Sequence, residues 1–272
     1  MKYKMIVLDL DDTLLRDDLT ISPRTKEALM TAQKEGVKVV LASGRPTFGM
    51  KPIAKELELE KYGSFILSFN GAKITDCRTG EEIFSSTLSV DTVHRLYRIS
   101  QEEGLSILTY SPDRIITENS NEYTEIESGL TGMSIQEVES FVETVREPVV
   151  KTLMVGAPEK VAEAEKKLQA ELAGELSVMR SKPFFLEFTE AGVDKGTSLH
   201  QLIGHLGIKQ EEVIAMGDSS NDLPMIRFAG LGVAMGNARE EIKEAADYVT
   251  DSNMNDGVAK VIEKFVFAYQ EA

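Results

Sequence analysis

The sequence has little or nothing of several features that define whole classes of protein. Cys77 is its single cysteine, which excludes an intrachain disulfide and a site of paired thiolates, so we interpret it as an ordinary small side chain. No apolar run reaches the roughly 18 residues that cross a bilayer. The chain starts with a strand-like run instead of the pattern of a signal peptide. We therefore expect a cytoplasmic protein with no membrane partner.

Basic residues and histidines are also few. The chain has 30 Lys and Arg against 45 Asp and Glu, a formal net charge of −15. Nucleic acid is not an expected partner, because phosphate backbones are held by clustered cations. His94, His200 and His205 lie on helix-like stretches without metal-ligand spacing, so we expect ordinary helix residues. A phosphorylated small molecule would need a locally supplied cation, and we infer no obligatory protein partner.

Short apolar runs alternate with helix signals at both ends of the chain. Ser22 followed by Pro23 is typical of a helix N-terminus. The alternation favours an α/β fold: a Rossmann-like, doubly wound parallel sheet with helices on both faces. Strands are predicted at 5–10, 37–42, 63–71, 213–217, 231–236 and 247–250, and helices at 23–36, from 46 onward, at 195–206, 221–230 and 238–246, and from about 256.

The rhythm changes in the middle of the chain, where strands follow one another directly. Mixed order and adjacent strands predict an α+β domain with an antiparallel sheet. We therefore expect a discontinuous core, 1–82 and 189–272, split by an inserted domain at 83–188. Within the insert we predict helices at 89–103, 135–146 and 158–173, strands at 105–110, 114–118, 150–155, 176–180 and 184–188, hairpin turns at 111–114 and 181–183, and a loop at 128–132.

Polar residues stand where the predicted core strands end. Asp9 closes the first strand, Ser43 follows the second, Asp218 follows strand 213–217, and Lys195 starts the helix leading to that strand. The carboxyl ends of parallel strands form the reactive edge of an open α/β sheet. Carboxylate oxygens suit Mg²⁺, and a cation with a lysine offsets repulsion between a carboxylate and a phosphate. The sequence therefore predicts a Mg²⁺-assisted phosphoryl-transfer site.

These residue types also indicate roles. Asp9 can attack phosphorus, and Asp11 can protonate the leaving group and then take a proton from water. Ser43 and the N–H of Gly44, at a helix start, are suited to phosphate oxygens. Asn221 could orient the lysine or donate to the phosphate.

Four motifs resemble, in order, those of the haloacid-dehalogenase superfamily of phosphatases. They are DLDDT (9–13), the serine of LASGR (41–45), the lysine of DKG (194–196) and GDSSND (217–222). The insert and SFNGA (68–72) resemble the Cof-type sugar-phosphate phosphatase branch, with its large α+β cap. The resemblance covers essentially the whole chain.

The resemblance implies a set of site residues. It makes Asp9 the nucleophile and Asp11 the acid and base. Asp12 stands where family members often have glycine, and we expect it to shape the backbone or lie just outside the metal's direct ligands. The implied metal ligands are Asp9, Asp218 and the main-chain carbonyl of Asp11, with Ser219 and Asp222 around the metal, and the implied phosphate contacts are the Leu10 main chain, Ser43, Gly44, Lys195 and Asn221.

Each motif has a simpler interpretation when taken alone. Aspartates at strand ends form turns, serines cap helices, and Asn70-Gly71 is typical of a hairpin turn. Near the hairpins of the insert, Tyr110, Arg114, Arg180 and Lys182 could contact a leaving group, but packing or solvated roles are simpler.

The ordered combination favours an enzyme: a Mg²⁺-dependent phosphatase for small phosphate esters, such as sugar phosphates, through an aspartyl-phosphate on Asp9. A phosphomutase and a non-catalytic phospho-acceptor or metabolite sensor are the alternatives.

Overall fold

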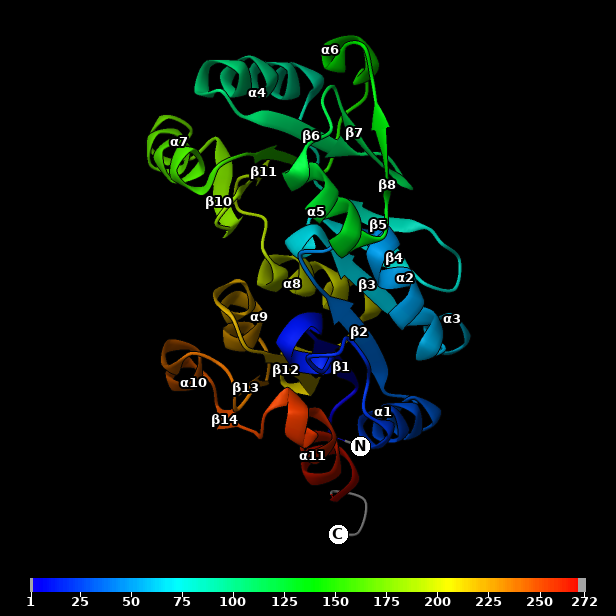
Figure 1. Ribbon diagram of the computed structural model, residues 1–272. Coiled ribbons are helices and arrows are strands. Elements are labelled where there is room, and N and C mark those ends of the chain that lie inside the picture. Colours follow the sequence, from blue (N-terminus) through cyan, green and yellow to red (C-terminus); the bar gives the residue numbers. More distant parts are fainter. Residues whose placement is uncertain (1, 269–272) are drawn as a thin grey trace. The chain divides into compact units, whose positions relative to one another are not determined.

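The computed structural model describes residues 2–268 and divides them into two compact units (Figure 1). Unit 1 contains residues 2–44, 50–84 and 194–268, and unit 2 contains residues 45–49 and 85–193. Helix α2 (Thr47–Glu56) therefore begins in unit 2 and continues in unit 1. Within residues 2–268, no helix has both the length and the apolar character needed to cross a membrane.

Unit 1 is built on an eight-stranded sheet. Its order is β14-β13-β12-β1-β2-β3-β4-β5. The pairs from β14 to β3 are parallel, as predicted, whereas β3 and β4 are antiparallel. The strands are β1 (Met5–Leu8), β2 (Lys38–Ala42), β3 (Phe65–Ser68), β4 (Lys73–Asp76), β5 (Glu82–Ser85), β12 (Val213–Gly217), β13 (Leu231–Ala234) and β14 (Tyr248–Val249).

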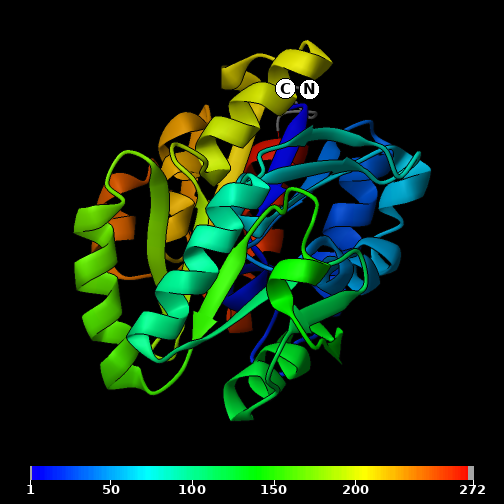
Figure 2. The same cartoon turned by 90° about the horizontal axis from the view of Figure 1, so that it is seen from above.

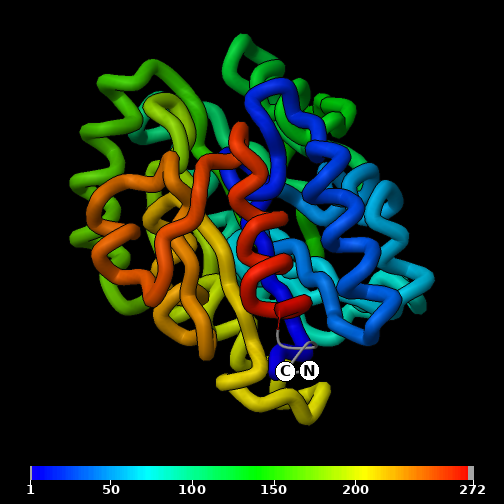
Figure 3. The backbone as a smooth tube through the Cα atoms, turned by 90° about the horizontal axis from the view of Figure 1, so that it is seen from below, coloured from blue at the N-terminus to red at the C-terminus, as the bar shows by residue number. Residues whose placement is uncertain are grey.

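Helices cover both faces of this sheet because its central strands are apolar on both sides. Ile6 and Leu8 pack with α1 (Pro23–Lys34), α2 and α11 (Gly257–Ile262), and Figure 3 shows α1 and α11 side by side on that face. Met5 and Val7 pack on the other face with α8 (Lys195–Leu206) and α9 (Leu223–Phe228). Successive strand residues point to opposite faces, which explains the alternation. The doubly wound α/β class is confirmed.

Helix α1 begins as predicted: Ser22 caps it by accepting from Thr25 N, and Pro23 is its first residue.

The remaining elements of unit 1 are short. The other helices and helical turns are η1 (Leu10–Leu14), α3 (Leu59–Tyr62), η2 (Phe69–Gly71), η3 (Gln210–Glu212), η4 (Ser220–Asp222), α10 (Glu240–Ala245), η5 (Asn253–Asn255) and η6 (Glu263–Phe267).

Unit 2 is an α+β unit with a six-stranded sheet of order β10-β11-β9-β6-β7-β8. All its pairs are antiparallel except β7 with β8. Helices α4 (Val90–Glu103) and α7 (Pro158–Glu171) pack on one face around Phe188 and Met154 (Figure 2). The strands are β6 (Ser106–Tyr110), β7 (Arg114–Thr117), β8 (Ser134–Glu137), β9 (Thr152–Val155), β10 (Leu176–Lys182) and β11 (Phe185–Glu190).

Two predictions for the insert were wrong. The predicted loop at 128–132 falls almost entirely in α5 (Glu122–Thr131), whose N-terminus is fixed by a capping box between Asn121 and Thr124. The predicted helix at 135–146 overlaps β8, followed only by the one-turn α6 (Phe141–Thr144). Pairing of β8 with β7 sets its conformation, so tertiary pairing overrides the local helix pattern.

Candidate active site

The carboxyl ends of three parallel strands lie next to one another in unit 1. Leu8 of β1 pairs with Leu41 of β2 and with Met216 of β12. The next residues along the chain are therefore brought to one edge, as the strand pattern predicts. Asp9, Ser43 and Asp218 follow these strand ends, and Asp9 and Ser43 are buried.

The chain leaves β1 through an irregular turn. Asp9 N donates to the carbonyl of Met216 at 3.1 Å. Asp11 is extended, with φ −70° and ψ 131°, and Asp12 adopts a left-handed conformation, with φ 60° and ψ 6°. Aspartate is among the residues that tolerate this region. Asp12 thus shapes the backbone directly after the two predicted catalytic aspartates, and its carbonyl accepts from Asn237 Nδ2 at 2.7 Å.

Lys195 is fully buried at the first position of α8, which Asp194 caps. Its Nζ donates to Asp9 Oδ1 at 2.5 Å and to Asp222 Oδ1 at 2.6 Å. Burial alone would lower the pKa of Lys195, but the two carboxylates outweigh it and raise that pKa. Lys195 is therefore a fixed cation beside Asp9.

Asp222 is a buried carboxylate whose two oxygens have different partners. Oδ1 accepts from Lys195, whereas Oδ2 accepts from the backbone N–H groups of Asp218 and Ser219, both at 3.0 Å. The sequence suggested only a place around a metal for Asp222. The ion pair of Asp222 with Lys195 depends on the burial of both side chains, and the sequence motif alone does not reveal that burial.

Asp218 is held by Thr13, whose buried hydroxyl donates to Asp218 Oδ1 at 3.0 Å. Burial and the charge of Asp222 raise the pKa of Asp218 to about 6, although Thr13 works against them. Burial and then Asp222 likewise raise the pKa of Asp9 well above its usual value, despite Lys195. Thr13 lies within the DLDDT motif, but the sequence did not indicate this contact.

The acidic residues of this site fit a metal ion. Asp9, Asp218 and Asp222 each offer a carboxylate oxygen, and these oxygens lie within 4.8 Å of one another. Three carboxylates face one ammonium group, so negative charge is in excess. Hard oxygen ligands in such surroundings suit a divalent cation.

The Ser43 loop and Asn221 meet at Asn70. Asn70 N donates to the carbonyl of Ser43 at 2.9 Å, and Asn221 Nδ2 donates to Asn70 Oδ1 at 3.0 Å. Ser219 Oγ donates to Asn221 Oδ1 at 2.7 Å. The sequence treated Asn70 as a turn residue, and its position between β3 and the antiparallel β4 agrees with that. Its contact with Asn221 was missed.

The remaining predicted residues take no part in the hydrogen bonds described above. Asp11 is exposed, whereas Leu10 is buried in the core of unit 1. Tyr110, Arg114, Arg180 and Lys182 belong to unit 2. Of these, Arg180 forms an ion pair with Glu165 at 2.9 Å.

A buried ionic cluster, which the sequence did not indicate, lies within unit 2. Lys151 Nζ is 3.2 Å from Glu187 Oε2 and 5.4 Å from the centre of the Tyr110 ring. Tyr110 Oη donates to Glu127 Oε1 at 2.7 Å. Burial raises the pKa of Tyr110 and of Glu127.

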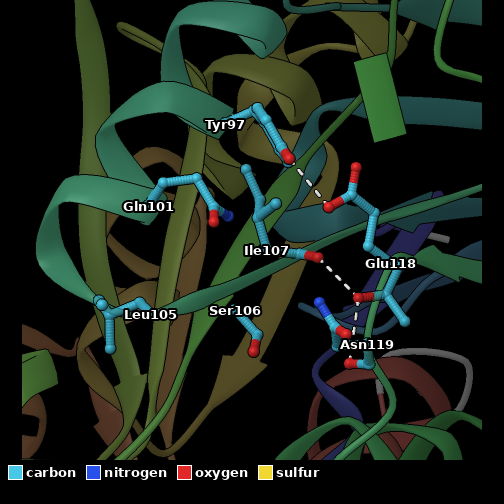
Figure 4. Close-up of a pocket in the computed structure, with 9 residues that line it drawn as sticks. Tyr97, Gln101, Leu105, Ser106, Ile107, Glu118 and Asn119 are labelled. Atoms are coloured by element: carbon cyan, nitrogen blue, oxygen red, sulfur yellow. Dashed lines mark hydrogen bonds between the residues drawn. The ribbon is translucent and has the colours of Figure 1, made fainter. Parts of the chain in front are cut away.

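Unit 2 also contains a polar pocket of about 200 Å³ between α4 and strands β6 and β7 (Figure 4). Tyr97 Oη donates to Glu118 Oε2 at 2.8 Å, and Thr117 Oγ1 donates to the carbonyl of Ile107 at 2.9 Å. The residues that line this pocket include none of the predicted site residues.

The doubly wound core, with a buried lysine between two aspartates at the strand ends, defines the class of haloacid-dehalogenase-type hydrolases. The family of haloacid dehalogenase-like hydrolases matches residues 6–262, and the chain belongs to this family.

Relatives and solved structures narrow the activity. A haloacid dehalogenase-like hydrolase from Bacteroides thetaiotaomicron has 46% sequence identity and a TM-score of 0.92, over 97% of this chain and 99% of that one. The 5-amino-6-(5-phospho-D-ribitylamino)uracil phosphatase YcsE of Bacillus subtilis strain 168 is 31% identical, over 97% of this chain and 96% of its own length. The subclass IIB sugar phosphatase BT4131 is 28% identical with a TM-score of 0.80, over 96% of this chain and 98% of that one. The chain is accordingly a phosphatase.

Proposed function

We propose that this phosphatase is Mg²⁺-dependent and hydrolyses small sugar phosphates through an aspartyl-phosphate on Asp9. The observation that carries the proposal is the buried Lys195 between Asp9 and Asp222, with Asp218 beside them. The relatives support the substrate class, since the names of YcsE and BT4131 give a phosphorylated ribityl compound and sugars as their substrates.

Asp9 is the proposed nucleophile. Like charges 4 Å apart cost about 4 kcal/mol at an effective dielectric of about 20, so a carboxylate approaches a phosphate only where cations offset the repulsion. Lys195 supplies one such charge 2.5 Å from Asp9. Asp9, Asp218 and the main-chain carbonyl of Asp11 would hold Mg²⁺, with Ser219 and Asp222 nearby, and the bound cation would supply the remaining positive charge.

Two half-reactions follow. In the first, an Asp9 oxygen bonds to phosphorus while the bond from phosphorus to the leaving oxygen breaks, and Asp11 gives that oxygen a proton. In the second, Asp11 takes a proton from a water molecule, and the water oxygen bonds to phosphorus. The bond between phosphorus and the Asp9 oxygen breaks, which releases inorganic phosphate and restores Asp9. Ser43, the N–H groups of Leu10 and Gly44, Lys195 and Asn221 are proposed to bind the phosphate oxygens.

Unit 2, on this proposal, is a cap that closes over the substrate and excludes water during the first half-reaction. Side chains of the cap would select the leaving group. The core and cap boundaries are proposed at 1–82, 83–188 and 189–272.

The deciding experiment measures phosphate release from an aryl phosphate and a panel of sugar phosphates, with and without Mg²⁺. We expect Mg²⁺-dependent turnover that both Asp9→Asn and Asp218→Ala abolish while circular dichroism shows a folded chain. Substantial turnover by folded Asp9→Asn would exclude the nucleophile assignment. An isomeric ester instead of free phosphate would identify a phosphomutase, and no turnover on any ester would favour a sensor.

A further inference from the structure

The turn at 69–71 has an unusual backbone. Phe69, Asn70 and Gly71 have φ values of 53°, 57° and 96°. Two consecutive residues other than glycine in the left-handed region are uncommon, and such residues persist only where their surroundings fix them. Asparagine is one of the few side chains that tolerate the region well. The surrounding structure therefore holds the turn in this conformation, and the contacts of the turn indicate what it positions.

One side of the turn holds the Ser43–Gly44 loop. Asn70 N donates to the carbonyl of Ser43 at 2.9 Å. A Cβ placed on Gly44 would lie 3.2 Å from Asn70 Oδ1, so the amide of Asn70 lies directly against the Gly44 backbone. The Asn70 side chain therefore packs against that backbone.

The other side of the turn is fixed to helix α8. Ser198 Oγ donates to the carbonyl of Gly71 at 2.5 Å. A Cβ on Gly71 would lie 2.6 Å from the carbonyl oxygen of Asp194, the residue that caps the helix of Lys195. The turn thus lies between the Ser43 loop and the start of the lysine helix.

The amide of Asn70 also contacts the amide of Asn221. Asn221 Nδ2 donates to Asn70 Oδ1 at 3.0 Å, while Asn221 Oδ1 accepts from Ser219 Oγ at 2.7 Å. The Asn221 amide thus presents its oxygen to Ser219 and its nitrogen to Asn70. A primary amide has two N–H donors, so the contact with Asn70 leaves one to donate to a phosphate oxygen.

We propose that Asn70 is a positioning residue for phosphate binding. It acts through Asn221, whose amide it orients, and through the Ser43–Gly44 backbone, against which it packs. This inference rests on the proposed function, because it assigns Asn221 and Gly44 to the phosphoryl group. Asparagine suits the position because it combines tolerance of a left-handed backbone with an acceptor oxygen and carries no charge that would repel the phosphate.

The test compares Asn70→Gly with the wild-type enzyme. Glycine accepts the backbone conformation but removes the acceptor. We expect about a tenfold rise in KM for an aryl phosphate and in the inhibition constant of inorganic phosphate, as for loss of one well-placed hydrogen bond, with a smaller change in kcat. Leu19→Gly is the matched control, since Leu19 is exposed and also left-handed, with φ 62°, and its kinetics should equal the wild type's.

A double-mutant cycle separates positioning from a general structural effect. If Asn70 acts through Asn221, the effects of Asn70→Gly and Asn221→Ala on the phosphate inhibition constant are not additive. Full additivity, or an unchanged inhibition constant in folded Asn70→Gly, would overturn the inference. Asn70→Ala, which also lacks an acceptor, is measured if the glycine variant does not fold. Failure of the proposed function would be seen separately, as absence of turnover in the wild type.

Discussion

Lys195 and Asp222 form an ion pair in which neither side chain is exposed, with Nζ 2.6 Å from Oδ1. The other oxygen of Asp222 accepts from two backbone N–H groups, so contacts other than the lysine also hold the carboxylate in place. Lys195 consequently depends on Asp222 as well as on Asp9 for compensation of its charge.

Removal of one partner from this buried pair should be costly. We predict that Asp222→Asn lowers the free energy of unfolding by about 3 kcal/mol, because the amide nitrogen that replaces one oxygen cannot accept from Lys195 or from the two backbone N–H groups. Urea unfolding followed by circular dichroism measures the change. Glu58→Gln is the control: it breaks the exposed Glu58–Lys61 pair, also at 2.6 Å, and should have little effect because solvent screens that pair. Equal effects of the two substitutions would contradict the prediction.

Thr13 should tune the affinity for the metal. Thr13→Val keeps the buried shape but removes the donor to Asp218 Oδ1, so the carboxylate is less well oriented. We predict about a tenfold rise in the Mg²⁺ concentration that gives half-maximal activity, as for other groups that orient metal ligands. Thr13→Ser, which keeps a hydroxyl, should stay close to the wild type. The same Mg²⁺ dependence for valine and serine would argue against this role.

The buried carboxyl of Glu127 should make unit 2 sensitive to pH. Burial raises the pKa of Glu127 above 4.5, although Lys151 works against this shift. The folded chain then binds this proton more tightly than the unfolded chain does. Its contribution to stability is therefore complete below pH 4.5 and is lost as pH rises through the raised pKa.

Glu127→Gln keeps an acceptor for Tyr110 and removes the titration. We predict that its free energy of unfolding, relative to the wild type's, increases as pH rises from 4.5 toward 7, in urea titrations at several pH values. Glu125→Gln, on the exposed side of the same helix, should follow the wild-type curve. A Glu127→Gln curve parallel to the wild type's would show that the carboxyl does not titrate differently on folding.

Cys77 should react slowly with thiol reagents. Burial, then the nearby carboxylates of Asp76 and Glu60, raise the pKa of its thiol to about 12. The thiolate is the reactive form, so little of it exists at pH 8. We predict that Ellman's reagent labels the folded chain much more slowly than the chain in urea. Equal rates would place an ordinary, accessible thiol at this position.

The sequence predicted the part of the site that depends on strand ends, because parallel strands bring those ends together whatever else the chain does. Asp9, Ser43 and Asp218 belong to that part. It did not predict the contacts of Asn70 and Thr13, which depend on a left-handed turn and on the rotamer of a buried hydroxyl. Helix α5 was missed because Gly129 and Gly132 suggest a loop, whereas the capping box at Asn121 starts a helix.

The pairing of β1 with β12 has a consequence for how the chain folds. Met5 lies opposite Val213, so one edge of β1 has no partner until more than two hundred further residues have been synthesised. The six strands of the second sheet all lie within residues 106–190 and therefore leave the ribosome before β12. Because closing long loops slows folding, unit 2 can complete its sheet before β12 pairs with β1 in unit 1. During synthesis, the apolar strand β1 therefore keeps one unpaired edge until β12 has been made.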